Sequence, residues 1–242
     1  MMRLISISFL LLLIDTLDLL SQSENDITKQ VWIDYNPNWF SRPDLEFRGN
    51  IGARKELENN GSWRLVIQPG VRYQIYSNTF ITAGVGSFYA FNEIIDDRWE
   101  IRPYQGLFIK WPRVKKVYLE HYFRLEERFD FNTTNWESKI SLRFRYRLLL
   151  VYKFGALAQH HRYWKIRAGG ESFITLSGEE GQFQERVRAI VSMERSLRRG
   201  FAFRFEIYWQ KESLFFLSDE SISCIFLRIR LLQSLSSFKL IH

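Results

Sequence analysis

The stretch that decides the fold is Trp63–Ile75, which reads WRLVIQPGVRYQI. Apolar residues occupy every second position, beginning with Trp63 and Leu65, whereas Arg64 and Arg72 stand on the positions between them. A period of two is the spacing of side chains on one face of a β-strand. The stretch therefore predicts a strand with one apolar face and one polar face.

The same alternation recurs along the rest of the chain. Further strands are expected at Leu45–Lys55, Phe80–Phe91, Trp99–Trp111 and Val117–Phe129, and near residues 140–148, 163–175, 184–196, 200–210 and 221–231. The sequence contains no amphipathic helical pattern of convincing length. It therefore predicts an all-β protein.

The expected strands are long, and their connections alternate in length. Strands of soluble proteins usually have about 5–6 residues, whereas these run for roughly 10–14, and membrane strands need about 9–11. Trp63 and Tyr73 share one face, and their separation gives about 25 Å of height at a tilt of roughly 40°. Trp99 and Trp111 bracket a similar band. We predict an antiparallel up-and-down transmembrane β-barrel of ten strands, with twelve as the alternative.

The N-terminus indicates export. Met1-Met2-Arg3 gives a positive start and Leu4–Ile14 is an apolar run of signal-peptide length, too short to span a membrane. We expect a cleaved signal peptide at residues 1–21, a periplasmic extension or an extra strand at 22–44, the barrel at 45–231 and a C-terminal tail at 232–242. This organisation places the protein in the cell outer membrane.

Alternation alone does not decide which face of the barrel contacts water. A soluble lipid-binding barrel would turn its apolar face inward, whereas a membrane barrel turns its charged face into the lumen. The expected signal peptide, the strand lengths and the bracketing aromatic residues favour the membrane barrel. The expected lumen network comprises Glu100, Arg102, Glu120, Arg124, Glu126, Arg128, Arg143, Arg145, Arg147, Arg167, Arg204 and Glu206, and the expected aromatic girdle comprises Trp63, Tyr73, Trp99, Trp111 and Trp209.

The charge balance suggests two uses for such a lumen. The chain has 242 residues, with 34 Lys and Arg against 27 Asp and Glu and a formal net charge of +7. Opposite charges on neighbouring strands would pair and hold the barrel together, because a guanidinium suits a carboxylate. The unpaired positive excess would alternatively provide a path for anions.

The sequence offers little enzyme chemistry. One cysteine, Cys224, excludes a disulfide framework, and the adjacent His160 and His161 would point to opposite faces of a strand. No Gly-x-Ser-x-Gly motif is present. We expect no enzyme activity, no metal and no cofactor, and, because the chain is expected to be exported, no nucleic-acid partner despite its basic charge.

Three motifs carry a family resemblance. They are Glu100-x-Arg102-Pro103-x-Gln105, the run HYFRLEER at 121–128 and the run RFRYRL at 143–148, which accompany the leader and an early Trp32. Together they resemble the domain of unknown function 2490 (DUF2490) family over about residues 30–231. The resemblance implies an outer-membrane β-barrel of Gram-negative bacteria, and it carries no catalytic residues to this chain.

The expected function is therefore that of an uncharacterised outer-membrane protein, either structural or in contact with a ligand. A small anion-preferring pore is the alternative, followed by a lipid-modifying barrel enzyme and a soluble lipid-binding barrel. The expected partners are outer-membrane lipids, lipopolysaccharide and, during biogenesis, the barrel-assembly machinery.

Overall fold

The computed structural model describes residues 27–57, 62–92, 96–157, 162–177, 185–197, 200–213 and 221–236. Within these ranges the regular secondary structure is entirely β-strand, which confirms the prediction of an all-β fold. No helix in the described ranges has the length and apolar character needed to cross a membrane. The expected signal peptide at 1–21 and the histidine pair at 160–161 lie outside the described residues.

Thirteen strand segments form one sheet. In chain order they are β1 (Thr28–Arg42), β2 (Leu45–Arg48), β3 (Ile51–Glu56), β4 (Trp63–Ile67), β5 (Gly70–Tyr76), β6 (Thr79–Phe91), β7 (Arg98–Lys110), β8 (Val117–Asn132), β9 (Ser138–Leu157), β10 (Arg162–Ser177), β11 (Glu185–Ser196), β12 (Phe201–Ser213) and β13 (Ser221–Ser236). From β6 to β13 each strand pairs antiparallel with the next one in the chain.

Two of the strands are each interrupted at one point. β2 and β3 are successive parts of one strand, since both pair with β1, and β4 and β5 are parts of the next, since both pair with β6. The interruptions lie side by side, where Asn50 and Gln68 exchange two backbone hydrogen bonds of 3.1 and 2.7 Å. Pro69 follows directly, and proline lacks the N–H that an uninterrupted ladder requires. The sheet therefore has eleven strand positions.

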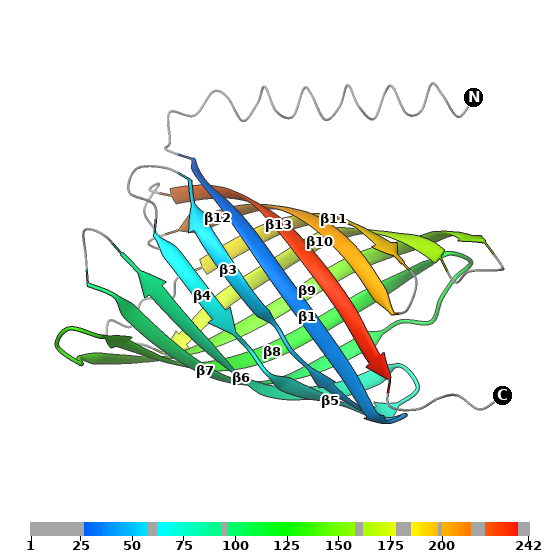
Figure 1. Cartoon of the computed structure of the whole chain (residues 1–242), viewed down its shortest axis with the longest axis horizontal. Helices are drawn as coiled ribbons and strands as arrows, with labels where there is room; N and C mark the ends of the chain where they lie inside the picture. Colours follow the sequence, from blue (N-terminus) through cyan, green and yellow to red (C-terminus); the bar gives the residue numbers. More distant parts are fainter. Residues whose placement is uncertain are drawn as a thin grey trace.

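The barrel closes through a parallel pair. β1 lies along β13 in register from Thr28 opposite Cys224 to Phe40 opposite Ser236, and Figure 1 shows the blue and red strands running side by side. The closed barrel agrees with the predicted fold class, but it has eleven strands and not ten or twelve. With an odd number of alternating strands the first and last run in the same direction, so only a parallel ladder can join them.

The sheet also exceeds its expected bounds of 45–231. β1 makes residues 28–42 part of the barrel wall, and β13 continues to Ser236. Of the segments expected outside the barrel, residues 22–26 and 237–242 lie outside the described ranges. The segment VWIDYNPNW at 31–39 alternates like its neighbours. A strand there gives an odd strand count, however, whereas outer-membrane barrels usually have an even one.

The two ends of the barrel differ. The turns at 43–44, 77–78 and 111–116 lie at one end, which we call the short-turn end. The ends of β3, β6 and β8, together with the start of β1, lie at the other, which we call the long-loop end because the sequence segments that follow these strands are longer. Each of the eleven strand positions runs from one of these ends to the other, and Figure 1 shows that the strands cross the barrel obliquely.

The parallel closure can be tested by cross-linking. Ile33 and Ile229 are register partners on β1 and β13, where strands lie about 4.8 Å apart. In a Cys224→Ser background, Ile33→Cys with Ile229→Cys should be joined in high yield by a short thiol-reactive linker, giving a shifted band on a denaturing gel. The pair Ile33→Cys with Ile140→Cys, from strands that are not neighbours, is the control. Equal yields for the two pairs would contradict the closure.

Candidate functional site

The interior of the barrel contains a cavity of about 1060 Å³. Its lining extends from Asn92 and Arg98 at the long-loop end to Gly200 and Ser234 at the short-turn end. Because side chains alternate between the two faces of a strand, every second one points into this lumen. The cavity therefore follows the barrel from one end to the other.

Basic side chains dominate the lining of this lumen. Among the described residues nineteen Arg and Lys side chains line the cavity, against eight Asp and Glu. Three more carboxylates, those of Asp34, Glu126 and Glu171, are buried in the interior, each no more than 3% exposed. Bases thus outnumber acids by nineteen to eleven, and the lumen has a positive excess of eight charges.

The most deeply buried carboxylate is that of Glu126 on β8, which is 0% exposed. It accepts a hydrogen bond of 2.8 Å from Nε of Arg143 and lies 3.0 Å from Nε of Arg124. Arg102 and Arg145 approach the same carboxylate at 3.9 and 3.8 Å. Four guanidinium groups therefore surround one carboxylate, which offsets the cost of burying it.

This cluster continues along the wall in both directions. On β7, Glu100 binds Arg102 at 2.6 Å and Arg128 at 2.5 Å. On β10, Glu171 binds Arg145 at 2.5 Å and Arg188 at 3.3 Å. We call the connected set from β7 to β11 the Glu126 network.

A second set of ion pairs begins on β10 and β11 and continues around the wall to β13 and β1. Its centre is Glu194 on β11, which contacts Lys165, Arg167 and Arg204 at 3.1, 3.0 and 2.6 Å. Arg204 also reaches Glu206 at 3.4 Å.

Arg228 carries this second set across the closure of the barrel. It lies 3.7 Å from Glu206 and donates a hydrogen bond of 2.6 Å to Asp34 on β1. Glu206 also accepts a hydrogen bond of 2.8 Å from the hydroxyl of Tyr208. We call this set the Glu206 network, and it ties β13 to β1 as well as to its antiparallel neighbours.

Each residue of the expected lumen network faces the interior, but not all of them are paired. The Glu126 network contains Glu100, Arg102, Arg124, Glu126, Arg128, Arg143 and Arg145, and the Glu206 network contains Arg167, Arg204 and Glu206. Glu120 and Arg147 line the cavity without an ion pair to any described residue. Arg147 instead lies over the ring of Tyr122 at 5.3 Å.

Two buried polar residues of β1 were not among the lumen residues predicted from the sequence, because residues 22–44 were not assigned to the barrel. Asp34 pairs with Arg228, and Asn36 accepts a hydrogen bond of 2.8 Å from Nε of Arg230. Their signal was present in the sequence, since Trp32, Asp34 and Asn36 share one parity in an alternating stretch. Extending the period-two pattern across residues 31–39 would have found them.

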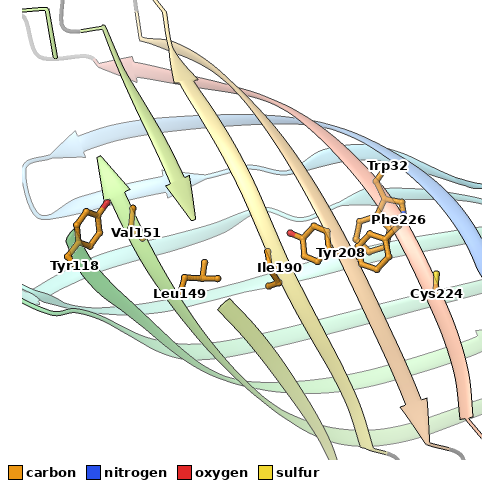
Figure 2. Close-up of a cluster of buried hydrophobic side chains, with 8 residues drawn as sticks. All are labelled: Trp32, Tyr118, Leu149, Val151, Ile190, Tyr208, Cys224 and Phe226. Carbon is orange, nitrogen blue, oxygen red and sulfur yellow. The ribbon is translucent and has the colours of Figure 1, made fainter. Parts of the chain in front are cut away.

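The lumen also contains a cluster of apolar side chains. Figure 2 shows Trp32, Phe226 and Tyr208 together near Cys224, with four other members on neighbouring strands: Ile190, Leu149, Val151 and Tyr118. The Phe226 ring stacks on Trp32 at 4.1 Å and on Tyr208 at 4.5 Å. Aromatic residues from β1, β12 and β13 therefore pack together on the lumen wall at the closure of the barrel.

The expected girdle residues occupy the positions whose side chains face away from the lumen. Trp63, Tyr73 and Trp111 are 46%, 38% and 53% exposed, and Trp99 and Trp209 are partly exposed. Trp63, Trp99 and Trp209 lie toward the long-loop end, whereas Tyr73 and Trp111 lie toward the short-turn end. Between them the outer face is strongly apolar, with exposed residues that include Ile33, Leu65, Ile67, Ile81, Val85, Ile140, Val191, Phe205 and Ile207.

Polar groups outside the lumen suggest no further chemistry. His121 belongs to the outward parity of β8, where it hydrogen-bonds the Tyr146 hydroxyl at 2.9 Å and stacks on Trp111. In the loops, Asn132 and Thr134 donate hydrogen bonds to Asp96, and these lower the pKa of its carboxyl. No group of three or more His, Cys, Asp and Glu able to hold a metal occurs among the described residues.

The fold and its interior define the class of protein: a closed β-barrel that turns charged side chains inward and apolar side chains outward. The chain belongs to the family described as protein of unknown function (DUF2490), whose model matches residues 29–215. The family resemblance inferred from the three sequence motifs is thereby confirmed. None of the curated proteins matches this chain.

Glu126 should be important for stability. Glu126→Gln would leave four arginines around a neutral side chain, and breaking a buried ion pair costs about 3–5 kcal/mol. Urea unfolding of the refolded protein in detergent micelles, followed by tryptophan fluorescence, measures the effect. Glu120→Gln removes the same charge from an unpaired lumen residue and should change the free energy of unfolding by no more than about 0.5 kcal/mol. Equal losses for the two variants would contradict this assignment.

Proposed function

We propose that the protein is an outer-membrane β-barrel whose cation-rich lumen passes small anions. The membrane part of the proposal is supported by the outer face, where large apolar side chains such as Ile67 and Ile207 are 57% and 58% exposed. A soluble monomer rarely exposes so extensive an apolar surface, whereas lipid covers such a band. Aromatic residues toward both ends of the band suit the two membrane interfaces.

The lengths of the connections support an orientation. Outer-membrane barrels have short periplasmic turns and longer external loops. The short-turn end would then face the periplasm, and the long-loop end would face outward. Outer-membrane lipids and lipopolysaccharide would contact the apolar band, and the barrel-assembly machinery would insert the chain.

The main support for the anion pathway is the composition of the cavity wall. Nineteen basic side chains against eight acidic ones line a cavity whose lining reaches both ends of the barrel. A wall of one dominant sign attracts counter-ions and repels ions of like charge. The lumen would therefore favour anions over cations.

A structural, non-conducting role is the second candidate, and the two ion-pair networks favour it. Most lumen cations contact a carboxylate, and one carboxylate, that of Glu126, is completely inaccessible. Such pairs hold side chains across neighbouring strands in fixed positions. In this case function would reside in the external loops.

Conductance distinguishes these candidates. In a planar bilayer under a salt gradient, the refolded protein should give discrete current steps and a reversal potential that favours anions. Arg147→Gln should shift the reversal potential toward zero, because one charge at 5 Å in water is worth about 0.8 kcal/mol, roughly a fourfold change in local anion concentration before screening.

The control for this experiment is Arg195→Gln on the outer face, where Arg195 lies over Trp164 at 4.5 Å. That variant removes the same charge and should leave the selectivity unchanged. Heat-modifiable gel mobility shows whether each variant has folded. A folded, inserted protein that carries no current, or that favours cations, would overturn the anion pathway.

A further inference from the structure

Two arginines of the lumen stand directly opposite each other without a carboxylate between them. Arg54 on β3 and Arg64 on β4 are register partners in an antiparallel pair. Side chains in such positions have Cβ atoms about 4.5–5.5 Å apart, and like charges placed there repel each other. Neither arginine forms an ion pair with any residue that the structure describes. This arrangement is costly unless an anion neutralises it.

Two of the neighbouring carboxylates are already engaged by other arginines. Asp34 is held by Arg228 at 2.6 Å, and Glu100 is held by Arg102 and Arg128 at 2.6 and 2.5 Å. These cations also add to the positive field that Arg54 and Arg64 experience. Glu56, two residues further along β3, lines the same cavity, and its carboxylate accepts a hydrogen bond of 3.3 Å from the Ser62 hydroxyl and forms no ion pair with Arg54 or Arg64.

Trp32 fixes the orientation of one of the two guanidinium groups. The guanidinium carbon of Arg54 lies 3.8 Å from the centroid of the Trp32 ring and 5.6 Å from that of the Phe88 ring. A guanidinium that stacks on an aromatic face keeps its N–H donors along the edge of its plane. Nε of Arg54 is buried and donates to no acceptor among the described residues.

The site is open to the lumen. Arg54, Arg64 and Trp32 all line the central cavity. Arg54 and Arg64 each lie near the long-loop end of their strands, two residues before the end of β3 and one after the start of β4. A solute entering the barrel from that end would meet these two arginines early in its path.

We propose that Arg54 and Arg64 form a binding site for a phosphate group. Two arginines at register-paired positions on one face of the wall can share the oxygens of one tetrahedral anion, and arginine is the side chain best suited to bidentate phosphate recognition. The proposal deepens the proposed anion pathway. It concerns equilibrium binding, however, and can therefore be tested independently of conduction.

Titration calorimetry of the refolded full-length chain in detergent micelles tests the site, with inorganic phosphate as the probe at low ionic strength. Saturable binding with one site per chain is expected. Arg54→Gln and Arg64→Gln should each weaken it at least tenfold. Arg147→Gln, which removes an equal charge from another unpaired lumen arginine, should change the affinity less than threefold.

The variants should fold, because each removes a repelled charge and not a paired one, and heat-modifiable mobility checks this. Arg64 is exposed to the lumen, so Arg64→Gln keeps the test valid if Arg54→Gln fails to fold. Titration with glucose 6-phosphate in parallel identifies the source of the phosphate group. Tighter binding of the ester indicates a phosphorylated solute, and equal or weaker binding indicates free phosphate.

The outcomes separate the two proposals. Phosphate binding that depends on Arg54 and Arg64 in a barrel that carries no current would support the site and refute the pathway. Anion-selective current without saturable phosphate binding would overturn the site and leave the pathway standing. Binding that all three arginine variants weaken equally would also overturn the site, because a diffuse positive field would then explain it.

Discussion

The sharing of most buried carboxylates among two or more basic side chains is the interaction on which this barrel depends. Alternation sends many charged side chains inward, and an isolated buried carboxylate is costly. Glu126 is surrounded by four guanidinium groups from β7, β8 and β9, and Glu194 by three cations from β10 and β12. Each such cluster spans more than one pair of strands, so it holds the wall together across the lumen face.

The parallel closure and the charged interior support each other. β1 brings Asp34 to Arg228 of β13, and it brings Trp32 under Arg54 of β3 and against Phe226 of β13. Without β1, these groups would lose a counter-ion or a stacking partner at the same time as β13 lost its backbone ladder. The eleventh strand is therefore integral to the barrel, and it also shapes the wall that carries the proposed phosphate site.

Much of this molecule could be predicted from local pattern, and the remainder depends on pairing between strands. The alternation at Trp63–Ile75 correctly assigned Arg64 and Arg72 to the interior and Trp63 and Tyr73 to the exterior, even though Pro69 interrupts the strand. Partners were not predictable, because register determines which inward side chains meet. The opposition of Arg54 and Arg64 arises from one β3–β4 register, and the contact of Asp34 with Arg228 arises from a closure between residues far apart in the chain.

The central claim is that the apolar outer face meets lipid while the charged inner face meets water. Single cysteines in a Cys224→Ser background test it in lipid vesicles, at Ala90 and Ala202 in the lumen and at Val191 and Ile207 on the outer face. The account predicts that a small charged thiol reagent modifies the two lumen positions, whereas only a lipid-soluble maleimide modifies the two outer positions. Ready modification of Val191→Cys and Ile207→Cys by the charged reagent would contradict it.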